Sequence, residues 1–310
     1  MSLAPIIVFA FNRPEALKNT IYSLLQNEEV KDSDLYVFVD GARSNKAGEA
    51  EKVQAVHDIV KRITGFKSIH YAFNESNKGL ANSIIQGTTR IINEYGKVIV
   101  VEDDLYVSSS FLRFMNEMLD KYEKDKRIFQ VSGYGSKIKR PSDYPYDIYL
   151  NERAQSWTWG TWKDRWVTVD WEVKDYKELK SSKVKQRKFD KRGSDLFKML
   201  KGYMEGKNNS WYIRFNYSMY KQGRYSINPI RSLVRNDGFN SEATHCNAYN
   251  RYKIDFEEIH SNDFITPSSL EPNETIMKEA VKYWSIPYRV YGKIMTIQHF
   301  GKFLPINLIK

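Results

Sequence analysis

The chain has 310 residues, 41% hydrophobic and 28% charged, which is the composition of a folded globular protein rather than a disordered one. The 48 basic and 38 acidic residues give a formal net charge of +10, which suits an anionic partner such as a nucleotide, an anionic lipid surface or a nucleic acid. Cys246 is the one cysteine, which excludes an internal disulfide, so we expect a reducing, cytoplasmic environment. No apolar run approaches the roughly 18 residues of a membrane-spanning helix.

The first 135 residues alternate short apolar runs with helical patterns, which predicts βαβ units and a mainly parallel sheet. Strands are expected at residues 6–11, 35–39, 68–73, 98–101 and 129–133. Apolar spacing predicts helices at about 14–25, 47–64, 84–92 and 111–122, the first of them with Pro14 at its first position. The expected fold class is therefore α/β, with a central sheet flanked by helices.

The fourth expected strand ends in three consecutive carboxylates. Val98–Val101 is a β-branched run typical of a strand buried on both faces, and Glu102, Asp103 and Asp104 follow it. Partly buried carboxylates must be paired or bound to a cation, because like charges repel. Open α/β sheets bind ligands at the carboxyl ends of their strands, where a hard divalent cation can carry phosphate oxygens. The triplet thus predicts a nucleotide-diphosphate site, although taken alone a solvated turn or helix cap explains it equally well.

The second half of the sequence has a different character. Residues 134–150 mix Gly, Pro, Tyr and charged residues, and a loop of this length is usually functional or mobile. Five of the seven tryptophans lie within 157–171, most of them expected in the core, with Trp157 or Trp159 as the better candidates for sugar stacking. The basic segment 174–192 is interpreted as an exposed helix or mobile segment rather than a nucleic-acid site, because charge runs are usually solvated.

The C-terminal region is expected to begin with a linker at residues 261–275. From Met277 onward, aromatic and aliphatic residues alternate with scattered lysines. This tail fits a packed terminal helix or a weakly amphipathic element at a membrane surface.

Four polar features are expected at one edge of the sheet. Asn12-Arg13 follows the first strand, Asp40 follows the second, Asn77-Lys78-Gly79 precedes a helix, and the acidic triplet follows the fourth strand. Each feature alone has an ordinary role as a cap, a turn or an exposed charge. Their joint placement favours a ligand site.

This layout resembles the GT-A class of nucleotide-sugar glycosyltransferases (families 2 and 13), and within it the bacterial enzymes similar to N-acetylglucosaminyltransferase I. The stretch 8–14, Val-Phe-Ala-Phe-Asn-Arg-Pro, is similar to the first strand and loop of that family, and Glu102-Asp103-Asp104 matches its acidic metal motif. The resemblance extends over about residues 5–246, through the segments Trp157–Trp166, Ser210-Trp211, Asn236–Phe239 and Thr244-His245-Cys246.

The resemblance implies metal-dependent transfer of a hexose or N-acetylhexosamine from a nucleotide sugar, usually a UDP-sugar, to a hydroxyl of a glycan or lipid-linked acceptor. Asp104 and His245 would bind Mn²⁺ or Mg²⁺, although His245 is as well explained as a partly buried structural histidine. The implied nucleotide-sugar-binding residues are Ala10, Asn12, Arg13, Asp40, Asn77, Lys78, Glu102 and Asp103. The implied acceptor-binding residues are Trp157, Trp159 and Trp211.

The catalytic base is the weak point of the resemblance. An inverting transferase needs a carboxylate to take the acceptor proton. In the eukaryotic relative this acid follows a tryptophan, whereas here Trp211 is followed by Tyr212 and Ile213. Asp164 is the substitute we expect, because other inverting GT-A enzymes carry acids just after a Trp-x-Trp-Gly block, but a helix cap or a salt bridge explains it as well. The other candidates are Glu152 and Asp237.

The expected organisation is a nucleotide-sugar-binding half at 1–135, an acceptor-binding and catalytic half at 136–260, and a linker with a helical tail at 261–310. The expected role is the synthesis of a bacterial surface polysaccharide or related glycan, with peripheral membrane contact through the basic tail. One alternative is a sugar-binding module that has lost its base. A nucleotidyltransferase is disfavoured because Phe9–Pro14 contains no glycine, and nucleic-acid binding is supported by charge alone.

Overall fold

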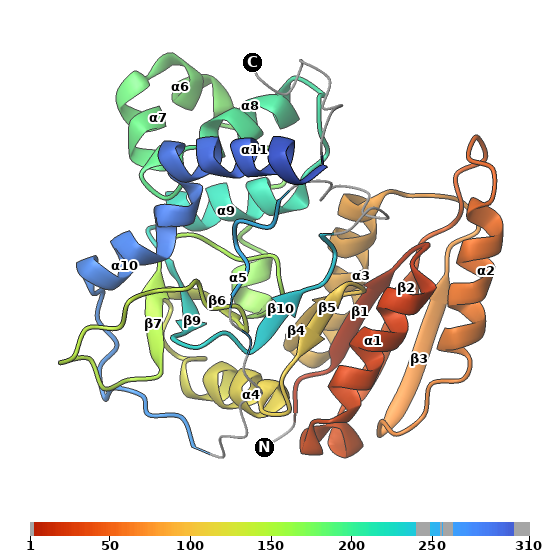
Figure 1. Ribbon diagram of the computed structural model, residues 1–310. Helices are drawn as coiled ribbons and strands as arrows, with labels where there is room; N and C mark the ends of the chain where they lie inside the picture. The colour runs from red at the N-terminus through yellow and green to blue at the C-terminus, as the bar shows by residue number, and fades with distance from the viewer. Residues whose placement is uncertain (1–2, 240–248, 255, 257–262, 301–310) are drawn as a thin grey trace.

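The centre of the computed structural model is an eight-stranded β-sheet with helices on both faces (Figure 1). The structure describes residues 3–239, 249–254, 256 and 263–300. In the order in which they lie side by side, the strands are β3 (Ser68–Phe73), β2 (Asp34–Val39), β1 (Ile6–Ala10), β4 (Lys97–Glu102), β8 (Trp159–Trp162), β6 (Ile128–Ser132), β9 (Tyr225–Pro229) and β7 (Ile148–Asn151). A separate antiparallel pair joins β5 (Leu105–Val107) to β10 (Val234–Asn236). The expected α/β fold is confirmed.

The helices of the first half connect the parallel strands, and those of the second half form a group of their own with the C-terminal helices. They are α1 (Pro14–Leu25), α2 (Glu49–Val60), α3 (Leu80–Tyr95), α4 (Phe111–Lys121), α5 (Lys163–Trp166), α6 (Tyr176–Ser181), α7 (Lys183–Asp190), α8 (Leu196–Met204), α9 (Trp211–Lys221), α10 (Glu274–Val281) and α11 (Ile286–Phe300), with 3₁₀ turns η1 (Glu28–Asp32) and η2 (Lys282–Trp284).

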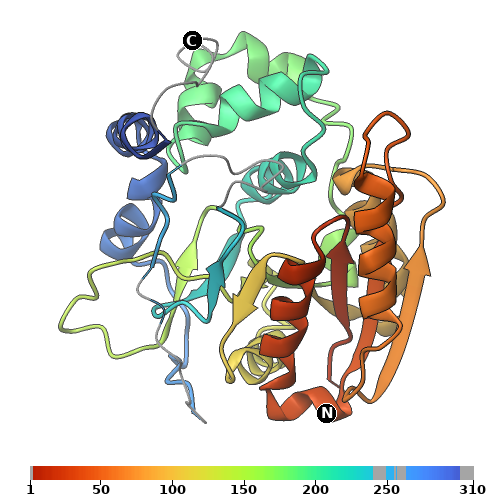
Figure 2. The same ribbon diagram turned by 45° about the vertical axis from the view of Figure 1, so that its right-hand side comes forward.

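Strand β1 shows why both faces of the sheet are covered. All of its residues are buried: Ile6 and Val8 pack on the side of α1 and α2, whereas Ile7 and Phe9 pack on the side of α3 and α9 (Figure 2). β1 pairs in parallel with β2 and β4, and β2 with β3, so the predicted βαβ arrangement is confirmed. Parallel pairing brings the carboxyl ends of β1, β2 and β4 to one edge of the sheet.

A strand that the sequence did not predict lies in the middle of the sheet. β8 pairs antiparallel with β4 on one side and with β6 on the other. Gly160 permits this contact, because a Cβ atom there would lie 2.9 Å from the carbonyl oxygen of Val98. Strands from both expected halves therefore belong to one sheet.

Aromatic side chains fill the face of the sheet under α5 and α9. Trp159 of β8 is completely buried and stacks on Trp166 at a centroid distance of 5.6 Å. Trp211 and Phe215 of α9 lie 5.1 and 5.5 Å from the same indole. The expectation that most of the tryptophans belong to the core is confirmed.

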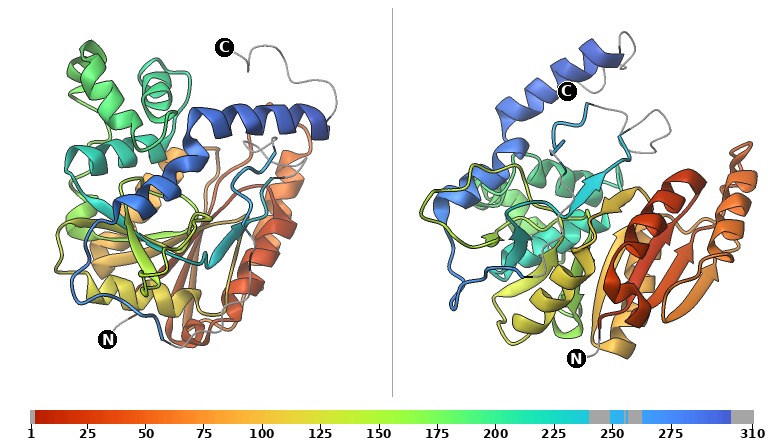
Figure 3. Two further views of the ribbon diagram at one scale, coloured as in Figure 1. Left: turned by 60° about the vertical axis from the view of Figure 1, so that its left-hand side comes forward. Right: turned by 60° about the horizontal axis from the view of Figure 1, so that its bottom comes forward.

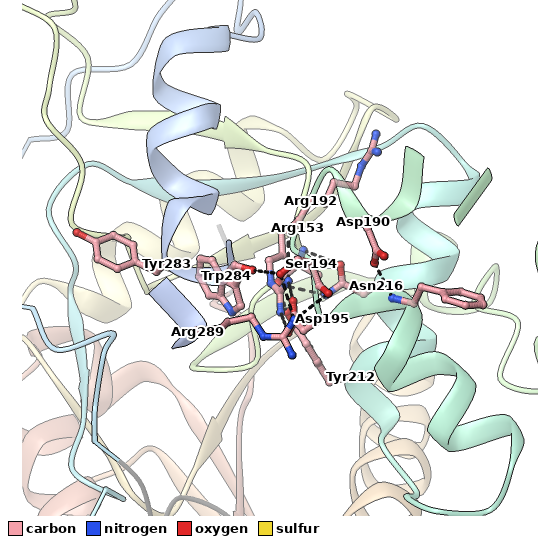
Figure 4. A network of polar contacts seen from close by, with 12 residues as sticks. Arg153, Asp190, Arg192, Ser194, Asp195, Tyr212, Asn216, Tyr283, Trp284 and Arg289 are labelled. Carbon is pink, nitrogen blue, oxygen red and sulfur yellow. Dashed lines mark hydrogen bonds and ion pairs between the residues drawn. The ribbon is translucent and has the colours of Figure 1, made fainter. Parts of the chain in front are cut away.

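A buried ion pair and its neighbours connect the second half of the chain to its C-terminal helices (Figure 4). The guanidinium of Arg153, 2% exposed, donates to both carboxylate oxygens of Asp195 at 2.9 and 3.0 Å and to the Tyr212 hydroxyl at 3.0 Å. The guanidinium also lies 4.5 Å from the ring centroid of Trp284. Nearby, Arg289 of α11 donates to the Ser194 carbonyl at 2.9 Å. These contacts hold the loop after β7, the turn before α8 and the segment η2–α11 together.

In the described part of the C-terminal segment, residues 274–300 contain α10, η2 and α11, and residues 263–273 form no helix or strand. Within the described part of the chain, no helix has the length and apolar character needed to cross a bilayer.

The Arg153–Asp195 pair provides a stability test. Burial alone would raise the pKa of Asp195, but the charge of Arg153 outweighs it and lowers that pKa. The pair therefore stabilises the fold above the ordinary carboxyl pKa, and this stability is lost as the pH falls through the lowered value. We expect Asp195→Asn to reduce the free energy of unfolding near pH 7 by about 3 kcal/mol in urea titrations, because a buried charge loses its partner.

The matched control is Glu178→Gln, which removes an exposed ion pair with Lys185 and is expected to cost less than ~1 kcal/mol. Equal effects of the two substitutions would show that the buried pair does not hold this region together.

Candidate active site

The loop after β1 reaches over the acidic end of β4. Phe9 of β1 is level with Glu102 of β4, so residues 11–13 leave the sheet beside the carboxylates. The backbone N–H of Phe11 donates to Asp103 at 3.2 Å, and the Arg13 guanidinium pairs with Asp104, with 2.7 Å between Nη1 and Oδ2. Pro14 begins α1 directly after Arg13, as predicted, and this fixes the direction in which the chain leaves the site.

The second, smaller sheet covers the same carboxylate from another side. The backbone N–H of Asp237, just after β10, donates to the backbone carbonyl of Asp104 at 3.0 Å. A Cβ atom on Gly238 would lie 2.1 Å from Asp104 Oδ2. Glycine is therefore required here for the backbone to approach the carboxylate. The segment Asn236–Phe239 is part of the family resemblance in the sequence, but no role for Gly238 could be predicted from it.

The acidic triplet has an unfavourable electrostatic environment. Burial and, to a smaller extent, the neighbouring charge of Asp104 raise the pKa of Asp103 to about 7. Burial and the charges of Asp104 and Asp103 likewise raise the pKa of Glu102. The pKa of Asp104 is raised by burial even though Arg13 opposes this shift. A further cation near the triplet would relieve the repulsion.

Asp104 has one oxygen available to such a cation. Its Oδ2 accepts from Arg13, while its Oδ1 is buried and has no hydrogen-bond partner in the described part of the chain. Among the described residues, no group of three or more His, Cys, Asp or Glu side chains could hold a metal ion. The residues fit a cation that takes one or two oxygens from the protein and the rest from a bound anion. His245, the other expected metal ligand, lies outside the described residues.

The ends of β1 and β2 are joined by the loop before α3. The Asp40 carboxylate is buried and accepts hydrogen bonds from the backbone N–H groups of Lys78 and Gly79, both at 2.9 Å. The Asn77 amide donates to the Gly41 carbonyl at 2.9 Å, and the Asp40 N–H donates to the Ala10 carbonyl at 3.0 Å. The expected residues of this group are thus brought together. Asp40 and Asn77 hold the loops, and the side chain of Lys78 is exposed.

A buried pair that the sequence did not reveal fixes Asn12. The Asn12 amide donates to Glu49 at 3.1 Å, and Glu49, only 5% exposed, also forms an ion pair with Arg43. Hydrogen bonds from Arg43 lower the pKa of Glu49 to about 2. The guanidinium of Arg43 lies over the ring of Phe11, 5.4 Å from its centroid. Glu49 looked like an ordinary surface acid of a helix in the sequence, because its partners come from distant loops.

Of the three tryptophans expected to bind the acceptor, Trp157 alone lies at the site. Trp159 pairs with Val100, so Trp157, two residues earlier, is level with the acidic end of β4. It is partly exposed and packs edge to face against Phe239 and Tyr252, at centroid distances of 5.9 and 5.7 Å. The expectation for Trp159 and Trp211 was wrong, because both side chains are buried in the aromatic core, with 0% and 3% exposed.

The structure does not bring Asp164 to the site. Asp164 lies in α5, and the preceding strand, β8, runs antiparallel to β4 and ends with Trp162 opposite Lys97, the first residue of β4. Asp164 is therefore at the far end of β4 from the triplet, roughly 16 Å along the strand. Its carboxylate pairs with Lys126 and Arg165, both at 2.6 Å. The expectation that Asp164 is the catalytic base was therefore wrong. Its carboxylate forms surface ion pairs instead.

The other two candidate bases differ in position. Glu152 is paired with Arg192 at 2.6 Å, in the region of the buried network. Asp237 lies against Asp104 through its backbone, is 47% exposed and forms an ion pair with Arg235 at 3.0 Å.

Comparison with known proteins identifies the class of this fold. The sequence profile of glycosyl transferase family 2 matches residues 6–178, more than half of the chain, so the chain belongs to this family. The expected relation to the glycosyltransferases is confirmed, whereas the closer similarity to N-acetylglucosaminyltransferase I stays a prediction. A comparison with curated proteins found no match.

Several solved structures are similar at low identity. The mannosyltransferase PcManGT of Pyrobaculum calidifontis, in complex with GDP-Man and Mn²⁺, is 11% identical, with a TM-score of 0.34 over 52% of this chain and 45% of that chain. Residues 1–349 of S. aureus TarS are 12% identical, with a TM-score of 0.41 over 76% and 60%. A UDP-glucose pyrophosphorylase complexed with UDP-glucose is 12% identical, with a TM-score of 0.37 over 73% and 90%. The chain thus covers less than half of the mannosyltransferase.

Gly238→Ala tests the packing around Asp104. The added methyl group must displace the Asp104 carboxylate or the β10 segment, so we expect ligand affinity at this site to fall at least about tenfold while the large sheet stays folded. The measurement is calorimetric titration of UDP with Mn²⁺, together with thermal unfolding. The control is Gly202→Ala, whose methyl group meets only the flexible end of the Asn208 side chain. Unchanged binding by Gly238→Ala would show that the Asp104 position does not matter.

The raised pKa of Asp103 predicts the direction of a pH effect. A carboxyl group whose pKa is raised on folding costs stability as the pH rises from its unfolded value, about 4, to its folded value, about 7. Asp103→Asn should therefore stabilise the protein at pH 8 by about 1 kcal/mol or more, and the gain should shrink at pH 5. Urea unfolding at the two pH values measures it. A loss of stability of equal size at both would contradict the repulsion.

Proposed function

We propose that this family 2 glycosyltransferase moves a sugar from a nucleotide-diphosphate sugar, most simply a UDP-sugar, to a hydroxyl of a glycan or lipid-linked acceptor. The observation that carries the proposal is Asp104, whose Oδ1 is buried among crowded carboxylates at the carboxyl edge of the sheet, with no hydrogen-bond partner among residues 3–239, 249–254, 256 and 263–300. Ligands of open α/β sheets bind at this edge. The proposed role is in bacterial surface glycan synthesis, in the cytoplasm at the inner face of the membrane.

The residues around Asp104 have distinct proposed tasks. Asp104 would hold Mn²⁺ or Mg²⁺, with His245 as a further ligand, and Arg13 and Lys78 would contact the diphosphate as positive charges. Asn12, Asp40 and Asn77 shape the loops that receive the base and ribose, and Glu102 and Asp103 would contact the ribose or donor sugar. When bound, a divalent cation would supply positive charge that stabilises the leaving diphosphate.

The reaction we propose is attack of an acceptor hydroxyl on the anomeric carbon, with release of the nucleoside diphosphate and inversion. Trp157, Phe239 and Tyr252 offer partly exposed aromatic faces beside the site for a sugar ring. Among the acids considered for the acceptor proton, Asp237 is the one that contacts the Asp104 backbone, and we assign the base role to it.

Arg13 links nucleotide and cation binding. Without a ligand, its guanidinium occupies Asp104 Oδ2 and partly neutralises the triplet. An anionic diphosphate gives Arg13 a second partner and leaves Asp104 free to bind a cation. The two ligands should therefore bind cooperatively, each raising the affinity for the other by the same factor.

Asp104→Asn tests the proposed function. We expect it to weaken Mn²⁺-dependent UDP binding by about a hundredfold, because one carboxylate–cation contact is lost. Asp164→Asn is the control and should bind and turn over as the wild type does. Normal UDP and Mn²⁺ binding by Asp104→Asn would refute the assignment of the site.

Arg13→Gln tests the link between the two ligands. It frees Asp104 and removes a contact to the diphosphate, so we expect tighter binding of Mn²⁺ alone, weaker binding of UDP alone, and a loss of most of the cooperativity. Electron paramagnetic resonance of free Mn²⁺ and calorimetry of UDP measure the two affinities. Weaker binding of Mn²⁺ alone would show that Arg13 does not compete for Asp104.

A binding module without catalysis is the second candidate function. Its support is the start of α9, where Trp211-Tyr212-Ile213 carries no carboxylate and the Tyr212 hydroxyl donates to the Ala154 carbonyl at 2.9 Å. This alternative predicts UDP-sugar binding with no transfer and no slow donor hydrolysis. An Asp237→Asn variant that loses hydrolysis but keeps donor affinity would exclude it.

A further inference from the structure

Helix α11 carries a continuous apolar stripe on its outer side. Ile286, Val290, Ile294 and Ile297 follow one another at intervals of four, four and three residues, which places them on one face of the helix. Their exposed fractions are 64%, 50%, 49% and 54%. Four large aliphatic side chains in one exposed row are unusual on a protein surface and mark an interaction site.

The opposite side of α11 is fixed to the body of the protein, so the stripe cannot turn inward. Thr296 is 4% exposed, and its hydroxyl accepts from the backbone N–H of Tyr249 at 2.9 Å. Arg289 donates to the Ser194 carbonyl, and Trp284, just before the helix, lies on the buried Arg153 guanidinium (Figure 4). The apolar stripe therefore has a defined orientation on the surface.

The exposed charge beside the stripe is basic. After Glu279 the sequence up to residue 310 contains no acid and five basic residues, of which Lys282 pairs with Glu279 and Arg289 contacts Ser194 on the fixed side of α11. Lys293 lies on the exposed side of α11. Residues 301–310 continue the same composition, with Phe, Leu and Ile between the two lysines. A second copy of this chain would bring like charges together, whereas anionic lipid headgroups complement them.

We propose that the outer face of α11 docks on an anionic membrane surface, with the aliphatic row in the headgroup boundary and Lys293 at the lipid phosphates. Resting on the proposed function, this inference selects a lipid-linked sugar as the acceptor class. α11 runs across the end of the molecule at which β1 has its carboxyl end, the end of the candidate active site (Figures 1 and 3). A docked enzyme would hold this end close to an acceptor anchored in the bilayer.

The test is co-sedimentation of the full chain with phosphatidylcholine vesicles that lack or contain about one quarter phosphatidylglycerol. We expect binding to the anionic vesicles only, and a decrease of at least about tenfold for the double variant Val290→Glu/Ile294→Glu. The control Val184→Glu changes an aliphatic residue of α7 that is 63% exposed, and it should bind as the wild type does. Lys293→Gln should weaken binding a few-fold and reduce its sensitivity to salt.

Three results would overturn the docking proposal: no binding of the wild type to anionic vesicles, equal binding by the double variant, or a wild-type dimer that the double variant converts to a monomer. Affinity for UDP with Mn²⁺ is measured on the same variants without vesicles. The double variant should keep that affinity and Asp104→Asn should keep vesicle binding, so failure of the docking surface and failure of the active site are distinguishable.

Discussion

The repulsion among three carboxylates at the end of β4 is the constraint on which the site depends. Glu102, Asp103 and Asp104 all have raised pKa values, and Arg13 is the cation that pairs with Asp104. The fold places them, largely buried, where a parallel strand ends, so solvent screens their charges incompletely. An arrangement that costs stability and serves no packing purpose is typical of a ligand site. The cation and diphosphate that we propose there would remove this cost.

The rest of the molecule fixes the surroundings of this triplet. β1 and β2 end beside it and bring the loops that carry Arg13 and Asp40, while the β5–β10 pair brings Gly238 against Asp104. The antiparallel strand β8 begins just after Trp157. It connects this partly exposed indole at the site with the buried aromatic side chains around Trp159. The buried Arg153–Asp195 pair lies next to these aromatic residues, and the contacts of Arg153 with Trp284 and of Arg289 with Ser194 connect it to the C-terminal helices. One sheet thus connects the donor loops, the aromatic faces and α11.

The sequence predicted the features that depend on local pattern. Apolar periodicity identified the parallel strands and their helices, and the run of acids after Val101 indicated the candidate site. It could not show β8, because Trp-Gly-Thr-Trp has no alternation and its pairing with β4 depends on Gly160. The positions expected for Trp159 and Asp164 were wrong for the same reason. The direction of β8 decides which residues in and after this strand reach the site. The roles of Glu49 and Gly238 arise from contacts between distant loops, which no local pattern records.

A crystal structure of the chain with UDP and Mn²⁺ tests the central claim most directly. We predict electron density for a cation on Asp104 Oδ1 that is shared with the diphosphate, and a guanidinium of Arg13 that has moved from Asp104 to the diphosphate. An Arg13–Asp104 pair that stays intact, with UDP bound elsewhere or absent, would contradict the account.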